Sequence, residues 1–162
     1  MKTLLLLRHA KSSWANDRLS DFERPLNDRG RHDAPRMGKL LRQRDLVPDR
    51  IISSSAKRAA KTAELVAAAA SYYADIRFTD KLYLAEPEAY IVLARQVEES
   101  CGTLMLVGHN PGIEELVAWL TGQGEPMPTA ALACIELPID NWGDLKAERH
   151  YKLAGLWRPK EL

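Results

Sequence analysis

The stretch LLLLRHAKSSW, residues 4–14, sets four leucines directly against an arginine and a histidine. A run that is apolar at every position predicts a central strand of a parallel sheet covered on both faces, and we place that strand at residues 3–7. Strands that simply leave the interior more often end in turn residues such as Gly, Asn, Asp or Pro. This strand ends in Arg8 and His9. The strand therefore either reaches solvent at Arg8 or carries functional side chains at its carboxyl end.

The composition is that of a soluble globular protein. The chain has 162 residues, 46% hydrophobic and 28% charged, with a formal net charge of +1. This predicts one domain over residues 1–162 and gives no case for nucleic-acid binding. No stretch of the sequence reaches membrane-spanning length, so we expect no membrane partner and a cytoplasmic location. Cys101 and Cys134 suit neither a zinc knuckle nor a redox pair, and each is expected to be a small buried apolar residue.

Strand and helix signals alternate along the chain. Further strands are predicted at 49–55, 76–83, 103–108, 131–138 and 151–157, and helices after Asn27 to about Arg44 and at 56–70, 87–99 and 110–120. Asn27 is expected to cap its helix, and Asn110 and Pro111 to open the last one. The alternation predicts a three-layer α/β/α sandwich around a mostly parallel central sheet. The last two strands, joined without a helix, predict an antiparallel pair at or near one edge of the sheet.

Arginine and histidine residues follow three of the predicted strands. Arg8 and His9 follow the first, Arg58 lies in the first turn of the helix after the second, and His109 follows the strand at 103–108. Because the carboxyl ends of parallel strands share one rim, where ligands bind, we expect these four side chains to converge.

The expected group has the character of a phosphoryl site. Arginine forks bind phosphate oxygens and stay charged, and helix N-termini add N–H groups. A histidine among cations has a lowered pKa, so it is neutral near pH 7 and can act as a nucleophile. Each residue alone has an ordinary alternative, since Arg-His is a common pair, His109 could serve a helix cap and Arg58 a solvated helix face. Their joint placement favours the site.

Four stretches carry a resemblance to a known family: LLLRHAKS (5–12), RPLNDRG (24–30), SSSAKRAAKTAE (53–64) and VGHNPGI (107–113). In this order the sequence resembles the histidine phosphatase superfamily and, within it, the SixA-type phosphohistidine phosphatases. The resemblance implies a phosphoglycerate mutase-like fold and transient phosphorylation of His9. It further implies that Arg8, Arg58 and His109 hold the phosphoryl oxygens. It implies a reaction without metal or other cofactor, and the sequence has no HxxH, HExxH or acidic cluster for a metal.

Two departures from the superfamily bear on substrate. Ala10 stands where the superfamily usually has glycine, which predicts an ordinary backbone angle and a slightly narrower pocket. Residues 71–85 are too short for the lid that supplies an acidic proton donor in phosphoglycerate mutases. Glu86 and Tyr83 lie where a donor would be, although Glu86 precedes Pro87 and can equally cap a helix. A phosphohistidine leaves as imidazole, so a weak donor suffices for it, whereas a phosphate ester benefits strongly from an acid.

The leading hypothesis is therefore a phosphohistidine protein phosphatase. Its partners would be phosphate ion and a histidine-phosphorylated protein, either a phosphotransfer domain or a phosphocarrier protein. Basic residues concentrate in the first third of the chain and form either a rim for an acidic partner or a solvated face: Lys11, Arg18, Arg24, Lys57 and Lys61. The alternatives are a phosphatase or mutase for small phosphorylated metabolites and, from another class, a non-catalytic phosphate-binding interaction module.

Overall fold

Six strands form one sheet in the order β3-β2-β4-β1-β5-β6 in the computed structural model, which describes residues 1–147 and 150–162. The strands are β1 (Lys2–Arg8), β2 (Arg50–Ser54), β3 (Ile76–Thr79), β4 (Thr103–Gly108), β5 (Leu132–Leu137) and β6 (Lys152–Trp157). The helices are α1 (Asp28–Gln43), α2 (Lys57–Ala69), α3 (Pro87–Arg95) and α4 (Gly112–Thr121), with short 3-10 turns η1 (Asp21–Glu23), η2 (Asp80–Leu82), η3 (Trp142–Asp144) and η4 (Pro159–Glu161).

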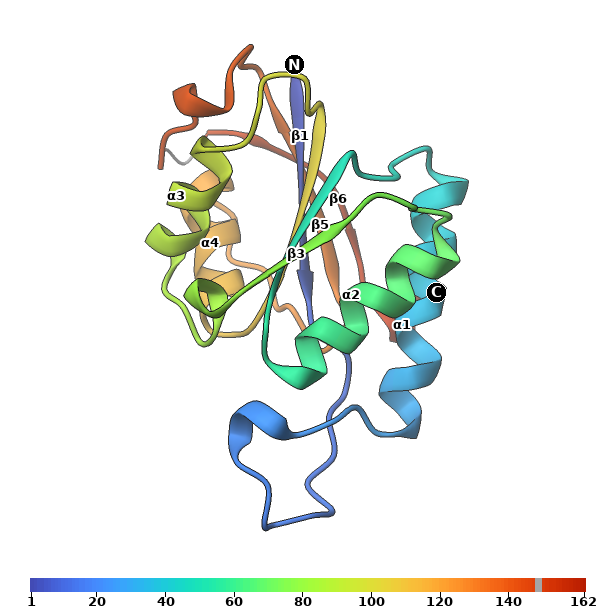
Figure 1. Cartoon of the computed structure of the whole chain (residues 1–162). Coiled ribbons are helices and arrows are strands. Elements are labelled where there is room, and N and C mark those ends of the chain that lie inside the picture. The colour runs from blue at the N-terminus through green and yellow to red at the C-terminus, as the bar shows by residue number, and fades with distance from the viewer. Residues whose placement is uncertain (148–149) are drawn as a thin grey trace.

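The sheet is mostly parallel, as the sequence predicts. β3, β2, β4 and β1 run parallel to one another, β5 pairs antiparallel with β1, and β6 pairs antiparallel with β5 at the edge. Helices α1 and α2 cover one face of the sheet, and α3 and α4 cover the other (Figure 1). This three-layer α/β/α arrangement confirms the expected fold class.

The position of β1 in the sheet explains why four consecutive leucines are apolar on both faces of this strand. Successive side chains of a strand point to opposite faces of the sheet. Leu4 and Leu6 accordingly enter the core beneath α3 and α4, whereas Leu5 and Leu7 enter the core beneath α1 and α2. Because β1 lies between β4 and β5, all four leucines are shielded from solvent.

Several element boundaries differ from the sequence expectations. β3 ends at Thr79, where the 3-10 turn η2 begins, and α3 ends at Arg95 instead of reaching residue 99. The cap of α1 is confirmed, because the side chain of Asn27 accepts a hydrogen bond from the Gly30 amide at 2.9 Å. The prediction for α4 is wrong: the helix begins at Gly112, with Pro111 as its N-cap.

Asn110 does not cap α4, because a tertiary contact uses its side chain. The Asn110 amide nitrogen donates to the Met127 carbonyl at 2.9 Å and to the Glu114 carboxylate. The two cysteines, in contrast, lie as expected: both are buried and neither forms a disulfide. In the described part of the chain, no helix combines the length and apolarity needed to span a bilayer.

Candidate active site

The register of two neighbouring strands brings two histidines side by side. β1 and β4 pair in parallel with Arg8 opposite Gly108, and the His9 amide donates to the Gly108 carbonyl at 3.0 Å. The next residue on each strand path is then a histidine. The imidazole rings of His9 and His109 have their centroids 5.1 Å apart. Both rings are buried, at 6% and 1% exposure.

The environment of His9 fixes its tautomer. Its Nδ1 lies 2.7 Å from the carbonyl oxygen of Ala10. A carbonyl oxygen only accepts hydrogen bonds, so Nδ1 carries the proton and Nε2 holds the free lone pair. Ala10 is buried, and its backbone φ lies outside the positive region, as the sequence predicts. The Ala10 amide donates a hydrogen bond to Thr62 Oγ1 at 2.9 Å. Thr62, on α2, therefore fixes the backbone that orients His9.

Arg58 reaches the lone pair of His9 from the first turn of α2. Its Nε donates toward His9 Nε2 over 3.4 Å, and only 3% of the residue is exposed. Thr62 Oγ1 donates to the backbone carbonyl of Arg58 at 2.7 Å, so the residue that orients Ala10 also bonds to the first turn of α2. The guanidinium thus lies against the unprotonated ring nitrogen of His9, the residue that the sequence predicts to react.

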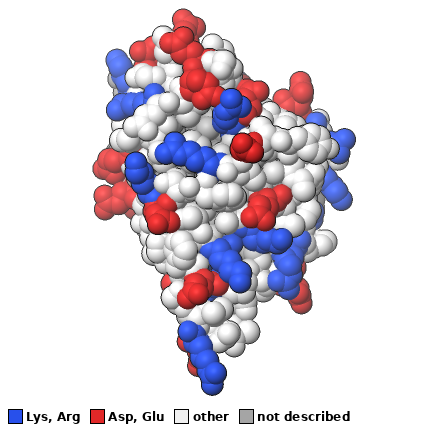
Figure 2. Space-filling view, in the orientation of Figure 1, with Lys and Arg blue, Asp and Glu red and all other residues white. Residues whose placement is uncertain are grey.

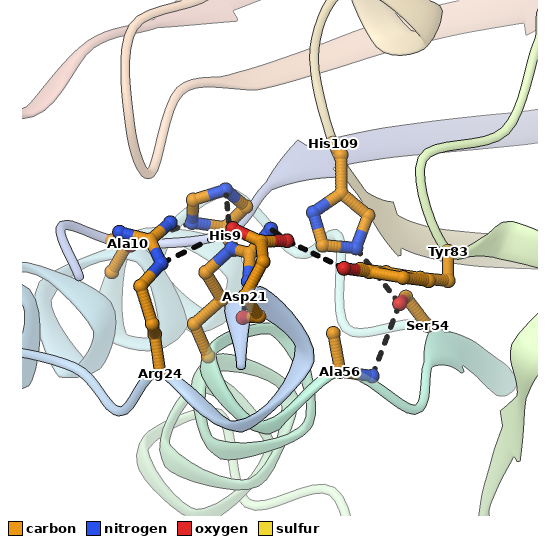
Figure 3. A network of polar contacts seen from close by, with 9 residues as sticks. His9, Ala10, Asp21, Arg24, Ser54, Ala56, Tyr83 and His109 are labelled. Carbon is orange, nitrogen blue, oxygen red and sulfur yellow. Dashed lines mark hydrogen bonds and ion pairs between the residues drawn. The ribbon is translucent and has the colours of Figure 1, made fainter. Parts of the chain in front are cut away.

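His109 is oriented by the strand beside it. Ser54, the last residue of β2, places its Oγ 2.8 Å from His109 Nε2 and accepts a hydrogen bond from the Ala56 amide at 3.2 Å. The Ser54 hydroxyl, whose oxygen already accepts from Ala56, uses its hydrogen by donating it to His109 Nε2. The proton of the neutral ring is then on Nδ1. Nδ1 is turned toward His9 (Figure 3).

Gly108 allows a close approach that supports the same segment. A Cβ at this position would lie 2.0 Å from the hydroxyl oxygen of Tyr90. Tyr90 is fully buried, and its hydroxyl accepts a hydrogen bond from the His109 amide at 3.2 Å. A side chain at position 108 would displace this contact and the backbone of His109 with it.

Unsatisfied polar atoms gather at this place. Among the described residues, four buried side-chain polar atoms lack a hydrogen-bond partner: Arg8 Nε, Arg24 NH1, His109 Nδ1 and Asn110 Oδ1. The first two carry hydrogens to donate, and so does His109 Nδ1 in the tautomer above. Buried donors are normally paired, so several unpaired donors at one spot indicate a site for an acceptor-rich anion.

Both histidines are neutral at pH 7. Burial, reinforced by neighbouring positive charge, lowers the pKa of His9 from 6.5 to about 3. Burial also lowers the pKa of His109 from 6.5 to about 4, with further lowering by Arg58, Arg8 and Arg24 and an opposing effect of Asp21. Three guanidinium groups therefore act on one imidazole, which agrees with a site built for negative charge.

The segment between β1 and α1 lies below the carboxyl end of the sheet and carries η1 (Figure 1). From it, Asp21 accepts hydrogen bonds from Arg58 NH2 at 3.0 Å and from the Tyr83 hydroxyl at 2.5 Å. Arg24 Nε donates to the same carboxylate at 3.2 Å, and the Arg24 guanidinium stacks 3.5 Å above the Trp14 ring. Figure 3 shows this carboxylate between Arg24 and Tyr83.

The four residues expected to converge do so, and others join them. Asp21, Ser54 and Thr62 were not predicted, although all three lie within or beside the stretches that carry the family resemblance. Arg24 was expected on a rim for an acidic partner or on a solvated face, but it is buried and forms an ion pair with Asp21. Acidic and basic side chains are interspersed on the face drawn in Figure 2, so that face is not uniformly basic.

The two suggested proton donors lie in different settings. Tyr83 stacks edge-on against His109, with 5.5 Å between ring centroids, and its hydroxyl hydrogen goes to Asp21. Burial, with the hydrogen bond to Asp21 as the next cause, raises its pKa, so the hydroxyl is protonated at neutral pH. Glu86 is exposed at the start of α3 and makes no side-chain cap bond. In the described ranges, no three His, Cys, Asp or Glu side chains are grouped to hold a metal ion.

Comparison with known proteins agrees with the fold. The model of the histidine phosphatase superfamily (branch 1) matches residues 4–83. A solved structure of SixA from Agrobacterium tumefaciens is 31% identical, with a TM-score of 0.83, and 98% of each chain is covered. SixA, a protein histidine phosphatase solved with tungstate, has the same fold at 20% identity, a TM-score of 0.83 and 98% coverage of each chain.

Sequence relatives extend the same likeness. An uncharacterized protein of Mycobacterium tuberculosis is 30% identical over 86% of this chain and 92% of its own length. A 2,3-bisphosphoglycerate-dependent phosphoglycerate mutase of Bifidobacterium longum is 36% identical, but over only 41% of this chain and 28% of the mutase.

The fold and the 31% identity to SixA over 98% of each chain define the class of the protein. The chain belongs to the histidine phosphatase superfamily. Within that superfamily it is SixA-type, and it is a phosphatase.

Proposed function

We propose that this chain is a phosphohistidine protein phosphatase that works through a transient phosphohistidine on His9. The observation that carries the proposal is the hydrogen bond between His9 Nδ1 and the Ala10 carbonyl at 2.7 Å. It leaves Nε2 as the nucleophilic nitrogen, and the lowered pKa of His9 keeps that nitrogen unprotonated at neutral pH. A phosphoryl group that bonds to this nitrogen needs hydrogen-bond donors for its oxygens.

The proposed clamp on the phosphoryl oxygens consists of Arg8, Arg58 and His109. Arg58 lies against Nε2, and Arg8 Nε and His109 Nδ1 are buried donors without a partner among the described residues. In the transition state of transfer the negative charge is spread over the three equatorial oxygens, so donors fixed around these oxygens stabilise that state. Arg24 NH1 adds a fourth donor to the same surroundings.

The reaction has two balanced steps. In the first, His9 Nε2 forms a bond to phosphorus while the bond from phosphorus to the substrate nitrogen breaks, and the leaving imidazole takes a proton from solvent. In the second, water forms a bond to phosphorus and the bond to Nε2 breaks. The water gives one proton back to solvent, and hydrogen phosphate leaves with His9 neutral again. His109, neutral and donating through Nδ1, is suited to hold an oxygen in both steps without giving up its proton.

Leaving-group chemistry supports phosphohistidine as the substrate. Tyr83 commits its hydroxyl hydrogen to Asp21, and Glu86 is exposed at the start of α3. Imidazole is a better leaving group than an alkoxide, so it depends least on a strong acid. We therefore propose a histidine-phosphorylated protein, either a phosphotransfer domain or a phosphocarrier protein, as the partner.

A phosphatase for small phosphorylated metabolites is the second candidate. The pair formed by Tyr83 and Asp21 beside Arg58 favours it, because a hydroxyl near the phosphoryl group is a possible proton source. If this pair protonates an alkoxide, alkyl phosphates become good substrates. A non-catalytic phosphate-binding module has no use for the free lone pair on His9.

The test compares three substrates on one enzyme preparation: a histidine-phosphorylated carrier protein, an aryl phosphate and 3-phosphoglycerate. We expect the highest kcat/KM on the phosphoprotein, a low value on the aryl phosphate and almost none on 3-phosphoglycerate. Similar values on 3-phosphoglycerate and the phosphoprotein would replace the proposal with the metabolite phosphatase. A complete lack of turnover on all three would favour the binding module.

Two further parts of the proposal concern metal and location. We propose metal-independent turnover, because fixed guanidinium groups already supply the positive charge, and EDTA should leave kcat unchanged. Full inhibition by EDTA that a divalent metal reverses would contradict this. We also propose a cytoplasmic location, supported by two buried cysteines that remain free thiols.

A further inference from the structure

Asp21 accepts hydrogen bonds from the guanidinium of Arg58, which the proposed clamp needs for the phosphoryl group. Its carboxylate accepts from Arg58 NH2 at 3.0 Å, and its backbone carbonyl accepts from Arg58 NH1 at 2.7 Å. The Tyr83 hydroxyl and Arg24 Nε donate to the same carboxylate at 2.5 Å and 3.2 Å. Neither step of the reaction proposed for phosphohistidine uses this acidic side chain.

A phosphoryl group on His9 would seek the same donors. Arg58 Nε points at His9 Nε2, and both terminal nitrogens of Arg58 are engaged by Asp21. Bidentate binding of a phosphoryl group by an arginine takes two of its nitrogens. A bound phosphoryl group would therefore share a guanidinium with a carboxylate of like charge, which raises the free energy of the pair.

Burial decides which partner gives way. The side chain of Arg58 is 3% exposed and is held within the first turn of α2, whereas the Asp21 side chain is 42% exposed. Asp21 belongs to the short turn η1 in the segment between β1 and α1. Arg58 is therefore the more buried of the two side chains, and we expect movement of Asp21 with η1 to be the less costly way to separate the two charges.

We propose that Asp21 is an internal competitor of the phosphoryl group for Arg58. The carboxylate holds the guanidinium whenever the anion is elsewhere, weakens the binding of inorganic phosphate, and so favours release of the product. Arg24 donates to the same carboxylate and stacks on Trp14, so a second guanidinium also holds the Asp21 side chain in place. The inference rests on the proposed phosphoryl site at His9.

The direct test is the Kd of inorganic phosphate, measured by isothermal titration calorimetry on the full chain. We expect Asp21→Asn to bind phosphate at least about threefold more tightly than wild type, a gain of the size that one partly exposed ion pair provides. Asp17→Asn, which removes a negative charge from an exposed position of the same segment, should change the Kd much less. Equal or weaker phosphate binding by Asp21→Asn would overturn the competition and make Asp21 a residue that positions Arg58.

A double-mutant cycle separates competition at Arg58 from a general effect of charge. In an Arg58→Ala background, Asp21→Asn should give no gain in phosphate affinity beyond that of Asp17→Asn. A gain of the same size in both backgrounds would contradict the proposal. Tyr83→Phe provides a milder variant, because it removes a hydrogen bond that holds the carboxylate in place, and it should shift the Kd in the same direction as Asp21→Asn.

The same titration distinguishes this inference from the proposed function. Wild-type protein that fails to bind phosphate at millimolar concentration would remove the phosphoryl site and the competition together. Wild type and Asp21→Asn that bind phosphate with equal affinity would remove only the competition. Far-UV circular dichroism of each variant confirms that the comparison is made between folded proteins.

Discussion

Acidification should destabilise this protein in a way that depends on His9 and His109. Both imidazoles are buried, and burial is the first cause of their low pKa values, about 3 for His9 and about 4 for His109 against an ordinary value of 6.5. Unfolding returns each ring to water and to its ordinary pKa. The unfolded chain therefore binds more protons than the folded chain wherever the pH lies between these values, and folding stability falls as the pH falls.

The size of the effect follows from the width of that interval. Above pH 6.5 both states carry neutral rings, and the stability is fully present. Between 6.5 and 5 the folded rings stay neutral while the unfolded rings become protonated. At about 1.4 kcal/mol per pH unit, the loss at pH 5 is on the order of 2 kcal/mol for each histidine. Asp21, whose pKa is lowered chiefly by the Tyr83 hydrogen bond, stays ionised throughout this interval.

Urea denaturation followed by circular dichroism, in buffers free of phosphate and sulfate, measures the loss at about pH 7 and about pH 5. The double variant His9→Gln, His109→Gln should lose far less stability than wild type over this interval. His32→Gln, which removes an exposed histidine of α1, controls for the loss of an imidazole as such. Inorganic phosphate should reduce the wild-type loss, because a bound anion favours protonated rings.

Equal pH dependence in wild type and the double variant would refute the reasoning. It would mean that the folded protein protonates these rings as readily as the unfolded chain does. The assignment of neutral rings to the folded state, and with it the unprotonated Nε2 of His9, would then be wrong.

Three further predictions concern the clamp, its support and the protein partner. Arg8→Ala and Arg58→Ala should each lower kcat by about 100–1000-fold, as the loss of an oxyanion donor does, with little change in far-UV circular dichroism; turnover within a few-fold of wild type would remove that residue from the clamp. Thr62→Val leaves the buried Ala10 amide without a hydrogen-bond partner, so it should lower the free energy of unfolding by about 1–3 kcal/mol and also lower kcat. The control variant Thr121→Val removes a comparable buried hydroxyl from α4 and should leave kcat unchanged. Raising the ionic strength should lower kcat/KM on the phosphoprotein more than on an aryl phosphate, because exposed charges are screened within about 8–10 Å; equal salt dependence would argue against an acidic partner.

The leucine run and the residues after it could be read correctly because burial and topology act on them together. A strand apolar on both faces has to lie inside a covered sheet, and a parallel sheet has to bring its carboxyl ends to one rim. Arg8, His9, Arg58 and His109 therefore converge wherever the strands are correctly placed. The pairing of Arg8 with Gly108 in register is what the sequence pattern does not specify.

The residues missed by sequence reasoning act through contacts between distant segments. Asp21 meets Arg58 across 37 positions and Tyr83 across 62 positions of the chain, and no local pattern reports such a meeting. Asn110 shows the same limit in reverse, because its sequence setting favours a helix cap, yet Met127 and Glu114 take its side chain. Arg24 appeared to be a surface cation because its partners, Asp21 and Trp14, are identified only by the fold.

Trapping the phosphorylated enzyme shows which atom attacks phosphorus. The enzyme is mixed with a histidine-phosphorylated protein, quenched rapidly in alkali, and the modified residue and ring nitrogen are identified by mass spectrometry and phosphorus NMR. We expect an alkali-stable, acid-labile phosphoryl group on Nε2 of His9. A folded His9→Ala variant should show neither this group nor turnover. A phosphoryl group on Nδ1 or on another residue, or normal turnover by His9→Ala, would contradict it.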